Sequence, residues 1–316
     1  MRGMTPGTQV SGYELVRIIG RGSRAVVWEA RVMETGQSVA LKVLDTLAEA
    51  APERLKAEFI AQSQIEHPNV VAVHGLVEIE GQLSLVAELV HGIDLREYIQ
   101  RFKPDQDQAV RLFGGILRGL SAAHALGLIH RDLKPNNILM PEGPYSTPKI
   151  LDFGVVKMAD SVDITQKGML LGTLRYMPPE QLRDPSGVDQ RADLFAAGCI
   201  LFELLTHQKM FDAPNKVALM NVVRLGQHTP FPEAIDPELQ ALVLELTALD
   251  PEQRPRTADE VLQRLGLNPE PSNADTVPLI LSPQAQTATL PWGLIVGIAV
   301  PLGMLAAALV IWFLRS

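Results

Sequence analysis

The sequence predicts an α+β protein of two lobes, followed by a membrane-spanning helix. Residues 13–87 contain short runs rich in Val, Ile and Leu that are typical of strands, whereas apolar residues recur at helical spacing from Asp94 onward. A run of strands followed by a run of helices indicates two segregated layers of structure. The last apolar stretch, residues 291–314, contains no charged residue and is long enough to cross a bilayer.

The first lobe is expected to be a β-sheet with one helix. Its strand-like runs cover residues 13–20, 26–33, 38–45, 70–80 and 83–89. Gly36-Gln37 and Glu80-Gly81 stand between neighbouring runs and are the expected hairpin turns. Residues 52–67 predict an amphipathic helix, and Pro52 near its start fits the first turn of a helix. Residues 1–12 are expected to form a flexible leader.

The second lobe is expected to be helical. Its helical periods cover residues 95–102, 108–127, 192–206, 237–250 and 257–266. One folded domain is therefore expected over residues 13–268, with a first lobe over 13–87, a connecting segment over 88–92 and a second lobe over 93–268. Residues 269–289 are rich in Pro, Ser and Thr and are predicted to be a linker, and the transmembrane helix follows over 290–314.

The expected span is uncharged over 24 residues, from Pro291 to Leu314. As a helix it would be about 36 Å long, against a hydrocarbon core of about 30 Å. The alternative, a buried core helix, rarely stays apolar on every side over this length. Trp292 and Trp312 stand near its ends, where the bilayer interface favours indole rings. The N-terminal region lacks the apolar run of a signal peptide, so the lobes are expected on the cytoplasmic side of the cell (inner) membrane, tethered by a single pass.

The composition excludes several classes of protein. A chain of 316 residues with 47% hydrophobic and 20% charged residues has the composition of a globular protein. Its net charge of −8 lacks the basic footprint of a nucleic-acid binder. The single cysteine, Cys199, excludes an internal disulfide and a Cys-rich zinc site, and its apolar surroundings predict a buried position.

Two glycines and a lysine form the first chemical motif. Gly20 and Gly22 stand in a turn between two expected strands, where backbone N–H groups can approach phosphate oxygens closely. A later strand with alternating apolar residues ends in Lys42, which would put a cation beneath that turn. Each feature alone has an ordinary alternative, namely a hairpin glycine and a solvated lysine.

The second motif consists of HRDLKPNN at residues 130–137 and DFG at residues 152–154. It brings Asp132, Asn137 and Asp152 onto neighbouring loops. Oxygen ligands of this kind suit Mg²⁺, which also binds substrate phosphates. Lys134 stands close to Asp132 and could neutralise a phosphoryl group during its transfer.

In this order and spacing the motifs resemble the eukaryotic-like (Hanks-type) protein kinases, in particular the membrane-tethered Ser/Thr kinases of bacteria. The resemblance covers residues 13–267. It implies the bilobal kinase fold, with residues 52–67 as helix C and residues 88–92 as the hinge. It also implies ATP and Mg²⁺, or Mn²⁺, as cofactors and proteins as phosphate acceptors.

The resemblance assigns the nucleotide-binding positions. Gly20 and Gly22 would cover the phosphates. Lys42 would hold the α- and β-phosphates, Glu58 would pair with Lys42, and Asp94 would bind the ribose. The remaining adenine-site positions that it implies are Val27, Ala40, Glu88, Val90 and Leu139.

The resemblance also assigns the catalytic positions. Asp132 would accept the proton of the substrate hydroxyl, and Lys134 would contact the γ-phosphate. Asn137 and Asp152 would bind the metal ion. The internal supports that it implies are an ion pair between Glu180 and Arg254 and a brace of the catalytic loop by Asp193.

Phosphorylation is expected on the activation segment, residues 152–180, which offers Ser161, Thr165 and Thr173. Thr165 occupies the place where bacterial relatives commonly autophosphorylate, and a phosphate there would pair with Arg131. Thr173 and Lys134 together form the pattern of Ser/Thr kinases, so a structural role is expected for Thr173.

Three positions depart from the family pattern. Ala25 replaces the third glycine of the loop and is expected to alter nucleotide affinity while activity is kept. Ala87 precedes the hinge and is either a harmless packing variation or the sign of an enlarged pocket behind adenine. Gln62 stands where an apolar side chain usually contacts Phe153, and a buried amide there needs a hydrogen-bond partner.

Two other functions share this fold. The alternative to an active kinase is a pseudokinase that acts as an ATP-binding scaffold, and the intact catalytic and metal positions argue against it. A small-molecule phosphotransferase is disfavoured by the full activation segment. Gly293 and Gly297 form a GxxxG step in the expected span, so a homodimer is considered beside a plain membrane anchor.

Overall fold

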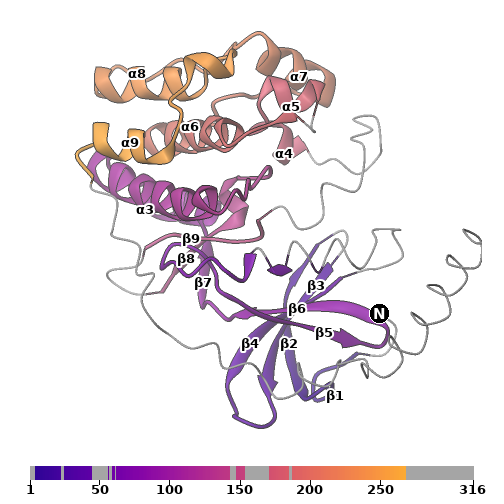
Figure 1. Cartoon of the computed structure of the whole chain (residues 1–316). Helices are drawn as coiled ribbons and strands as arrows, with labels where there is room; N and C mark the ends of the chain where they lie inside the picture. The colour runs from indigo at the N-terminus through magenta and orange to yellow at the C-terminus, as the bar shows by residue number, and fades with distance from the viewer. Residues whose placement is uncertain are drawn as a thin grey trace, which may run out of the picture. The chain divides into compact units, whose positions relative to one another are not determined.

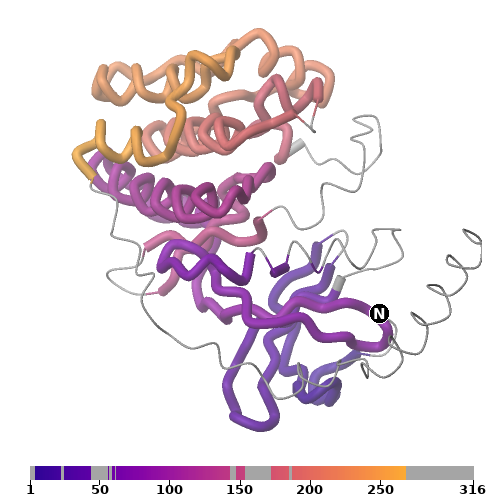
Figure 2. The backbone as a smooth tube through the Cα atoms, in the orientation of Figure 1, coloured from indigo at the N-terminus to yellow at the C-terminus, as the bar shows by residue number. Residues whose placement is uncertain are grey.

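The computed structural model describes residues 4–22, 25–44, 56, 59–60, 62–142, 147–153, 171–184 and 187–267. The chain divides into two compact units, Met1–Ala274 and Asp275–Ser316. All described residues belong to the first unit and are drawn in colour in Figures 1 and 2.

The first lobe is a six-stranded antiparallel sheet with the strand order β1-β2-β3-β4-β6-β5. Its strands are β1 (Gln9–Val10), β2 (Tyr13–Arg21), β3 (Ala25–Val32), β4 (Ser38–Leu44), β5 (Val73–Ile79) and β6 (Gln82–Glu88). The sheet buries an apolar cluster that includes Leu15, Trp28 and Leu41. The five predicted strands are confirmed, with the fourth starting at Val73.

Both predicted hairpin turns are present. Glu80 and Gly81 have positive φ values of 50° and 75° and alone connect β5 to β6, as expected for a turn that matches the twist of its strands. Gly36 has a φ of 74° and donates its backbone N–H to the carbonyl of Val32 over 2.8 Å.

The prediction of a flexible leader over residues 1–12 is wrong for the residues that form β1. Gln9 and Val10 pair with Glu14 and Tyr13. Leu15 donates its N–H to the carbonyl of Thr8 over 2.9 Å. A strand of two residues gives no periodic signal in a sequence, and these backbone bonds are what define it.

A second, three-stranded sheet lies between the large sheet and the helices (Figure 1). It consists of β7 (Gly92–Asp94), β8 (Ile138–Pro141) and β9 (Lys149–Ile150). Ile150 donates its N–H to Asn69 over 2.8 Å, and Val71 donates to Ile150 over 2.9 Å. The start of the predicted 70–80 strand therefore pairs with the second lobe and connects the two lobes through backbone hydrogen bonds.

The second lobe is helical (Figures 1 and 2). Its helices are α2 (Leu95–Phe102), α3 (Gln106–Ala125), α4 (Leu171–Leu174), α5 (Pro179–Arg183), α6 (Arg191–Thr206), α7 (Lys216–Arg224), α8 (Pro237–Leu246) and α9 (Ala258–Arg264), with the short 3-10 helices η1 (Pro135–Asn137) and η3 (Pro251–Gln253). All five predicted helices of this lobe are confirmed, while α4, α5 and α7 were not predicted. The α8 helix ends at Leu246 instead of residue 250, because Thr247 folds its hydroxyl back to the carbonyl of Val243 over 2.7 Å.

Helix packing explains the all-round apolar sequence of α6. Fifteen of its sixteen residues, from Ala192 to Thr206, are buried, and they include Cys199 as predicted. At Gly198 an added Cβ would come within 2.7 Å of the Cβ of Leu246, so glycine permits the close approach of α8. The α3 helix approaches Asn69 through Gly119 in the same way, with 2.8 Å between an added Cβ and the Asn69 carbonyl oxygen.

The helix predicted over residues 52–67 is described only in part. Residues 56, 59, 60 and 62 are helical, and Ser63 donates its N–H to the carbonyl of Phe59 over 2.8 Å. Among the described residues no helix is long and apolar enough to cross a membrane. The linker predicted over 269–289 and the span predicted over 290–314 lie outside the described residues.

Candidate active site

The glycine-containing turn joins β2 to β3. Gly20 pairs with Val27 across the two strands, and Gly22 donates its N–H to the carbonyl of Ala25 over 2.8 Å. Ala25 begins β3 and pairs with Leu44, so the residue that replaces the third glycine is part of the sheet. The two tip residues of the turn, 23 and 24, lie outside the described residues.

Lys42 brings a cation from the sheet to the helical lobe. It lies in the middle of the sheet, on β4, opposite Val27 on one side and Leu85 on the other. Its Nζ lies 2.7 Å from Oδ2 of Asp152, whose backbone has a φ of 51°. The pairing predicted between Lys42 and Glu58 stays a prediction, because Glu58 lies outside the described residues.

The catalytic-loop motif forms a compact polar group. Lys134 Nζ donates to Asp132 Oδ2 over 2.9 Å and to Thr173 Oγ1 over 3.2 Å. Asn137 Nδ2 donates to the Asp132 carbonyl over 2.9 Å, and Leu151 donates its N–H to the Asn137 carbonyl over 2.9 Å. The two motifs, 130–137 and 152–154, are therefore neighbours in space, as the sequence predicted.

Asp193 on α6 holds the start of this loop. Its Oδ1 accepts the N–H of Arg131, and its Oδ2 accepts the N–H of His130 and Nε2 of His124, each over 2.8 Å. Burial would raise the pKa of Asp193, but the hydrogen bond and the charge of His124 outweigh it and lower the pKa below its ordinary value. The predicted brace is confirmed, and His124 is a partner that the sequence analysis missed.

The brace holds Arg131 in an unusual backbone conformation. Arg131 has a φ of 62°, which is uncommon for a residue with a side chain. Its N–H is bound by Asp193, and its carbonyl accepts Nε2 of Gln181 over 2.7 Å. His130 then donates or accepts through Nε2 at the carbonyl of Leu151 over 2.8 Å, and its ring lies 5.0 Å from that of Phe153.

The segment predicted as the hinge, residues 88–92, connects the two lobes. Glu88 donates its N–H to Ala72 over 2.9 Å, and its carboxylate pairs with Lys149 of β9 over 2.9 Å. Val90 is partly buried against the small cluster that contains Ala87. The Glu88 side chain therefore contributes to the contact between the lobes.

Asp94, the residue predicted to bind the ribose, accepts two hydrogen bonds from within the protein. Asp94 caps α2 through Oδ1, which accepts the N–H of Glu97 over 2.8 Å, while Oδ2 accepts Nδ2 of Asn136 over 2.8 Å. A ribose hydroxyl would share these oxygens with two protein donors. Leu139 on β8 pairs with Asp94, and Ala40 on β4 pairs with Ala87, so both predicted adenine-site residues lie at the junction of the lobes.

The two departures near the hinge are buried. Ala87 is 8% exposed and packs with Val73 and Leu85. Gln62 is 4% exposed, and within the described residues its Oε1 has no hydrogen-bond partner. Among the described residues the hydrogen-bond partner expected for Gln62 is therefore missing, and a buried oxygen without a partner reduces stability.

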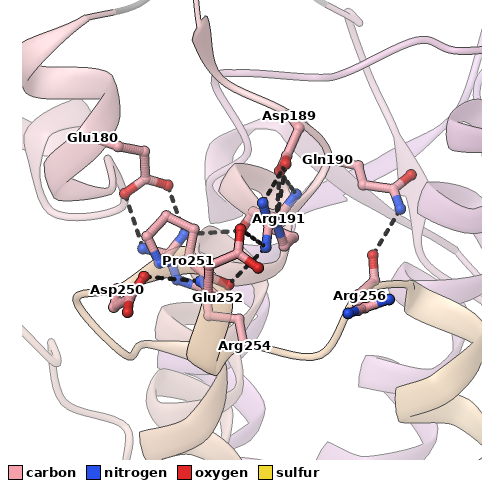
Figure 3. Close-up of polar contacts among 9 residues, drawn as sticks. All are labelled: Glu180, Asp189, Gln190, Arg191, Asp250, Pro251, Glu252, Arg254 and Arg256. Carbon is pink, nitrogen blue, oxygen red and sulfur yellow. Dashed lines mark hydrogen bonds and ion pairs between the residues drawn. The ribbon is translucent and has the colours of Figure 1, made fainter.

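The ion pair predicted between Glu180 and Arg254 is confirmed (Figure 3). The two guanidinium nitrogens donate to the two carboxylate oxygens over 2.6 and 2.9 Å. The Arg254 side chain is fully buried, also donates to the carbonyls of Ala248 and Arg191, and stacks over the ring of Phe195. This bidentate pair ties the end of the activation segment to the loop after α8.

A second buried network was not predicted. Tyr176 donates its hydroxyl to Glu203 over 2.6 Å, and Lys209 pairs with the same carboxylate. Burial, together with the charge of Glu203, raises the pKa of Tyr176 well above its ordinary value. Glu203 and Lys209 lie in later segments of the chain, and neither carries a local sequence signal for this network.

The predicted phosphorylation sites are mostly outside the described residues. Ser161 and Thr165 fall in residues 154–170, which are not described. Thr173 is described, and its hydroxyl accepts a hydrogen bond from Lys134. This contact fits the structural role that was expected for Thr173.

The residues at the junction fit a divalent cation in their chemistry. Asp152 offers a carboxylate, and Asn137 offers its side-chain oxygen because its nitrogen is bound to the Asp132 carbonyl. Within the described part of the chain, no group of three or more His, Cys, Asp or Glu forms a metal site. Two protein ligands are typical of Mg²⁺, which keeps waters and substrate phosphates in its other positions.

The six-stranded sheet joins a helical lobe, and Lys42, Asp132, Asn137 and Asp152 lie where the two lobes meet. The chain matches the protein kinase domain over residues 13–265 and belongs to this family. The resemblance predicted from its motifs is confirmed.

Two bacterial relatives are similar along the kinase domain. The chain is 36% identical over 265 residues to serine/threonine-protein kinase pkn3 of Myxococcus xanthus, covering 78% of this chain and 48% of that protein. It is 35% identical over 273 residues to serine/threonine-protein kinase PknB of Mycobacterium leprae (strain TN), covering 81% of this chain and 43% of that protein. The chain thus spans less than half the length of these curated relatives.

A solved structure shares the fold. The crystal structure of Rad53 1-466 in complex with AMP-PNP matches with a TM-score of 0.67 and 25% sequence identity, covering 79% of this chain and 64% of that chain. The AMP-PNP belongs to that structure.

Proposed function

We propose that this chain is a serine/threonine protein kinase that transfers the γ-phosphoryl group of ATP to hydroxyl groups of proteins. One observation carries the proposal: Lys134 connects Asp132 to Thr173, while Lys42 reaches from the sheet to Asp152. Four segments of the chain thus meet at the junction of the two lobes. The names of the two bacterial relatives support the same activity.

Asp132 is the proposed base. The substrate hydroxyl oxygen attacks the γ-phosphorus, the bond to the β–γ bridging oxygen breaks, ADP leaves, and the hydroxyl proton passes to the Asp132 carboxylate. The carboxylate is fixed by Lys134 at 2.9 Å, so its orientation does not depend on substrate. An acceptor in hydrogen-bond reach is what such a proton transfer needs.

Two lysines supply fixed positive charge. Lys42 is proposed to bind the α- and β-phosphates and Lys134 the transferring group, because the loose transition state spreads negative charge over its oxygens. A bound Mg²⁺ or Mn²⁺ would neutralise further phosphate charge. Asn137 and Asp152 are the residues proposed to hold it, and the N–H groups beside Gly20 and Gly22 are proposed to cover the phosphates.

The test is a phosphate-transfer assay on the full chain with labelled ATP and a generic basic protein. Asp132→Asn should lower kcat by about two orders of magnitude or more, since positioned proton acceptors contribute about 10²–10⁴-fold. Lys42→Met should lower it similarly, whereas Asp107→Asn, at an exposed position in the first turn of α3, should leave it unchanged. Equal label in wild type and both active-site variants would reject the proposal and favour the ATP-binding scaffold.

Autophosphorylation of the activation segment is part of the proposal. Arg131 is held at its N–H by Asp193 and at its carbonyl by Gln181, which supports a fixed receptor for a phosphate. Thr165 is the proposed acceptor, with Ser161 as the second candidate and Thr173 reserved for its bond to Lys134. Mass spectrometry of active protein should find phosphate on Thr165, and active protein with unmodified Thr165 would contradict this step.

Membrane tethering is proposed from the sequence alone. The uncharged stretch from Pro291 to Leu314 supports a single-pass helix in the cell membrane with the kinase domain on its cytoplasmic side. Full-length chain should stay in membranes after alkaline carbonate extraction, and a chain lacking residues 290–314 should be released. Extraction of both forms would refute the tether.

Homodimerisation through the GxxxG step is the last part of the proposal. Small residues let two helices approach closely in lipid, and a tethered pair would phosphorylate each other at a high effective concentration. Gly297→Ile should then slow autophosphorylation in bilayers. Equal rates for both forms would show that the span is only an anchor.

A further inference from the structure

A polar pocket lies on the helical lobe, and none of the residues proposed to bind nucleotide or metal or to transfer phosphate lines it. It encloses about 460 Å³, within the range of about 300–1,000 Å³ that small-molecule sites occupy. Its polar lining comes from the end of α3, the start of α6 and the segment between α8 and α9. The polar side chains are His124, Asp189, Gln190, Arg191, Glu252 and Arg256.

Most donors in this lining are already used (Figure 3). Arg191 donates through Nε to Asp189 over 3.0 Å, and its two terminal nitrogens lie 2.8 Å from Asp189 and from Glu252. Gln190 Nε2 donates to the carbonyl of Arg256 over 2.7 Å. These bonds leave the oxygen of Gln190 and the remaining lone pairs of the two carboxylates as unused acceptors.

The charge of the lining is negative around Arg191. Two carboxylates share this one guanidinium, and their side chains are 52% and 71% exposed, so both remain accessible. Burial would raise the pKa of Asp189, but hydrogen bonds from Arg191 outweigh it and keep the pKa below its ordinary value. Arg256 is the second cation of the lining, and its side chain is exposed.

His124 adds a buried acceptor. Its Nε2 lies 2.8 Å from the buried carboxylate of Asp193, which fixes the proton of the neutral ring on Nε2 and leaves Nδ1 as an acceptor. The side chain is only 5% exposed, and within the described residues Nδ1 has no hydrogen-bond partner. The side-chain torsion of His nearest the ring is broad, so a small tilt can present Nδ1 to the pocket while Nε2 keeps its bond.

We propose that this pocket binds a small organic cation that carries N–H donors, namely a primary ammonium or a guanidinium group. Such a group would donate to His124 Nδ1, to the oxygen of Gln190 and to the two carboxylates beside Arg191. An anion would meet those carboxylates, and an apolar ligand would leave the acceptors unpaired. The binding itself does not depend on the proposed kinase activity.

The site is connected to the catalytic loop by three hydrogen bonds. A donor on Nδ1 holds the imidazole in the tautomer that donates from Nε2 to Asp193. Asp193 in turn binds the N–H groups of His130 and Arg131, directly before Asp132. A ligand that donates to Nδ1 and the hydrogen bond to Asp193 therefore favour the same tautomer of His124.

The experiment is a calorimetric titration of the full-length chain with putrescine at pH 8. Putrescine should bind, and succinate, a dianion of similar length, should not. Glu252→Gln should weaken putrescine binding about threefold, as expected for loss of one partly exposed charge contact, and Arg256→Ala should tighten it because a like charge is removed. Glu238→Gln, which removes an exposed acid on α8 outside the pocket, is the matched control and should change nothing.

Binding should also move the ¹⁵N resonance of His124 Nδ1, assigned by its loss in His124→Gln. A primary ammonium could also come from a lysine side chain of a partner protein. Lysine with both backbone ends blocked tests this source, and tighter binding of blocked lysine than of putrescine would identify it. Failure of both amines to bind at millimolar concentration would overturn the proposal. So would tighter binding of succinate, or equal putrescine affinity in wild type and Glu252→Gln.

Discussion

Two groups of charged residues in this protein differ in burial. At the junction of the lobes, the side chains of Lys42, Asp132, Lys134 and Asp152 are between 17% and 44% exposed. Within the helical lobe, the side chains of His124, Asp193 and Arg254 are between 0% and 5% exposed. Under the proposed function the first group must stay accessible to substrates, whereas the second group holds backbone segments through buried hydrogen bonds.

The energetic consequences differ in the same way. Exposed ion pairs contribute about 0–1 kcal/mol to stability, whereas removing one partner of a buried pair costs about 3–5 kcal/mol. Substitutions in the partly exposed group should therefore lower the proposed activity and spare stability, whereas substitutions in the buried group should lower stability first. The predictions below test this division from the largest expected change in unfolding free energy to the smallest.

Arg254→Met should cause the largest loss of stability. It leaves Glu180 and the carbonyls of Ala248 and Arg191 without their donor, although the apolar part of the side chain is kept. The free energy of unfolding should fall by about 3–5 kcal/mol, measured by urea denaturation.

Arg264→Met is the matched control. Arg264 also pairs with two carboxylates, those of Glu245 and Glu260, but its side chain is 43% exposed. Its loss should cost no more than about 1 kcal/mol. Similar losses for the two variants would show that burial is not what separates the two groups.

Asp193→Asn should have a smaller effect on stability and a visible effect on turnover. Three donors converge on its two oxygens, and an asparagine has only one oxygen and adds two donors. A buried donor left unpaired costs about 1–3 kcal/mol, and kcat should fall about tenfold because the loop before Asp132 loses its brace. Asp105→Asn, at the exposed N-cap of α3, should change neither quantity, since Asn and Asp cap equally well.

The pH dependence of wild type should follow the lowered pKa of Asp193. The carboxylate contributes its stability fully above its ordinary pKa of about 3.9, and the contribution is lost only as the pH falls through the lower folded value. The Asp193 carboxylate itself should therefore contribute no change in unfolding free energy between pH 5 and pH 8. This is measured in a His124→Gln background, because the charge of His124 also acts on Asp193. A loss in that range that Asp193→Asn removes would contradict the direction of the shift.

The sequence predicted elements well where periodicity is long. The helix expected over residues 95–102 is α2 without change, and the helix expected over 192–206 differs from α6 by one residue. The strand β1, the three-stranded sheet and the short helices α4 and α5 were missed, because elements of two to five residues show little periodicity. The helix α7 was also missed, although its nine residues make it longer than α2.

The contacts of the candidate site also differ in how far they could be predicted from the sequence. Asp132, Lys134 and Asn137 share one motif, so the sequence could place them together. The pairs Lys149–Glu88, Asn136–Asp94 and His124–Asp193 join residues 61, 42 and 69 positions apart. A single sequence carries no signal for such contacts, because each partner is an ordinary polar residue in its own segment.

Gln62 is buried like the charged residues of the second group, but it is neutral and its oxygen has no partner among the described residues. Its replacement leads to the smallest predicted change in unfolding free energy. Gln62→Leu replaces the amide with an apolar side chain of similar size and should raise the free energy of unfolding by about 1 kcal/mol, measured by urea denaturation. Gln263→Leu, at an exposed position on α9, is the control and should not stabilise the protein. If Gln62→Leu instead lowers stability while the control does not, the amide has a partner that stabilises it, and Gln62 follows the same rule as the other buried polar groups.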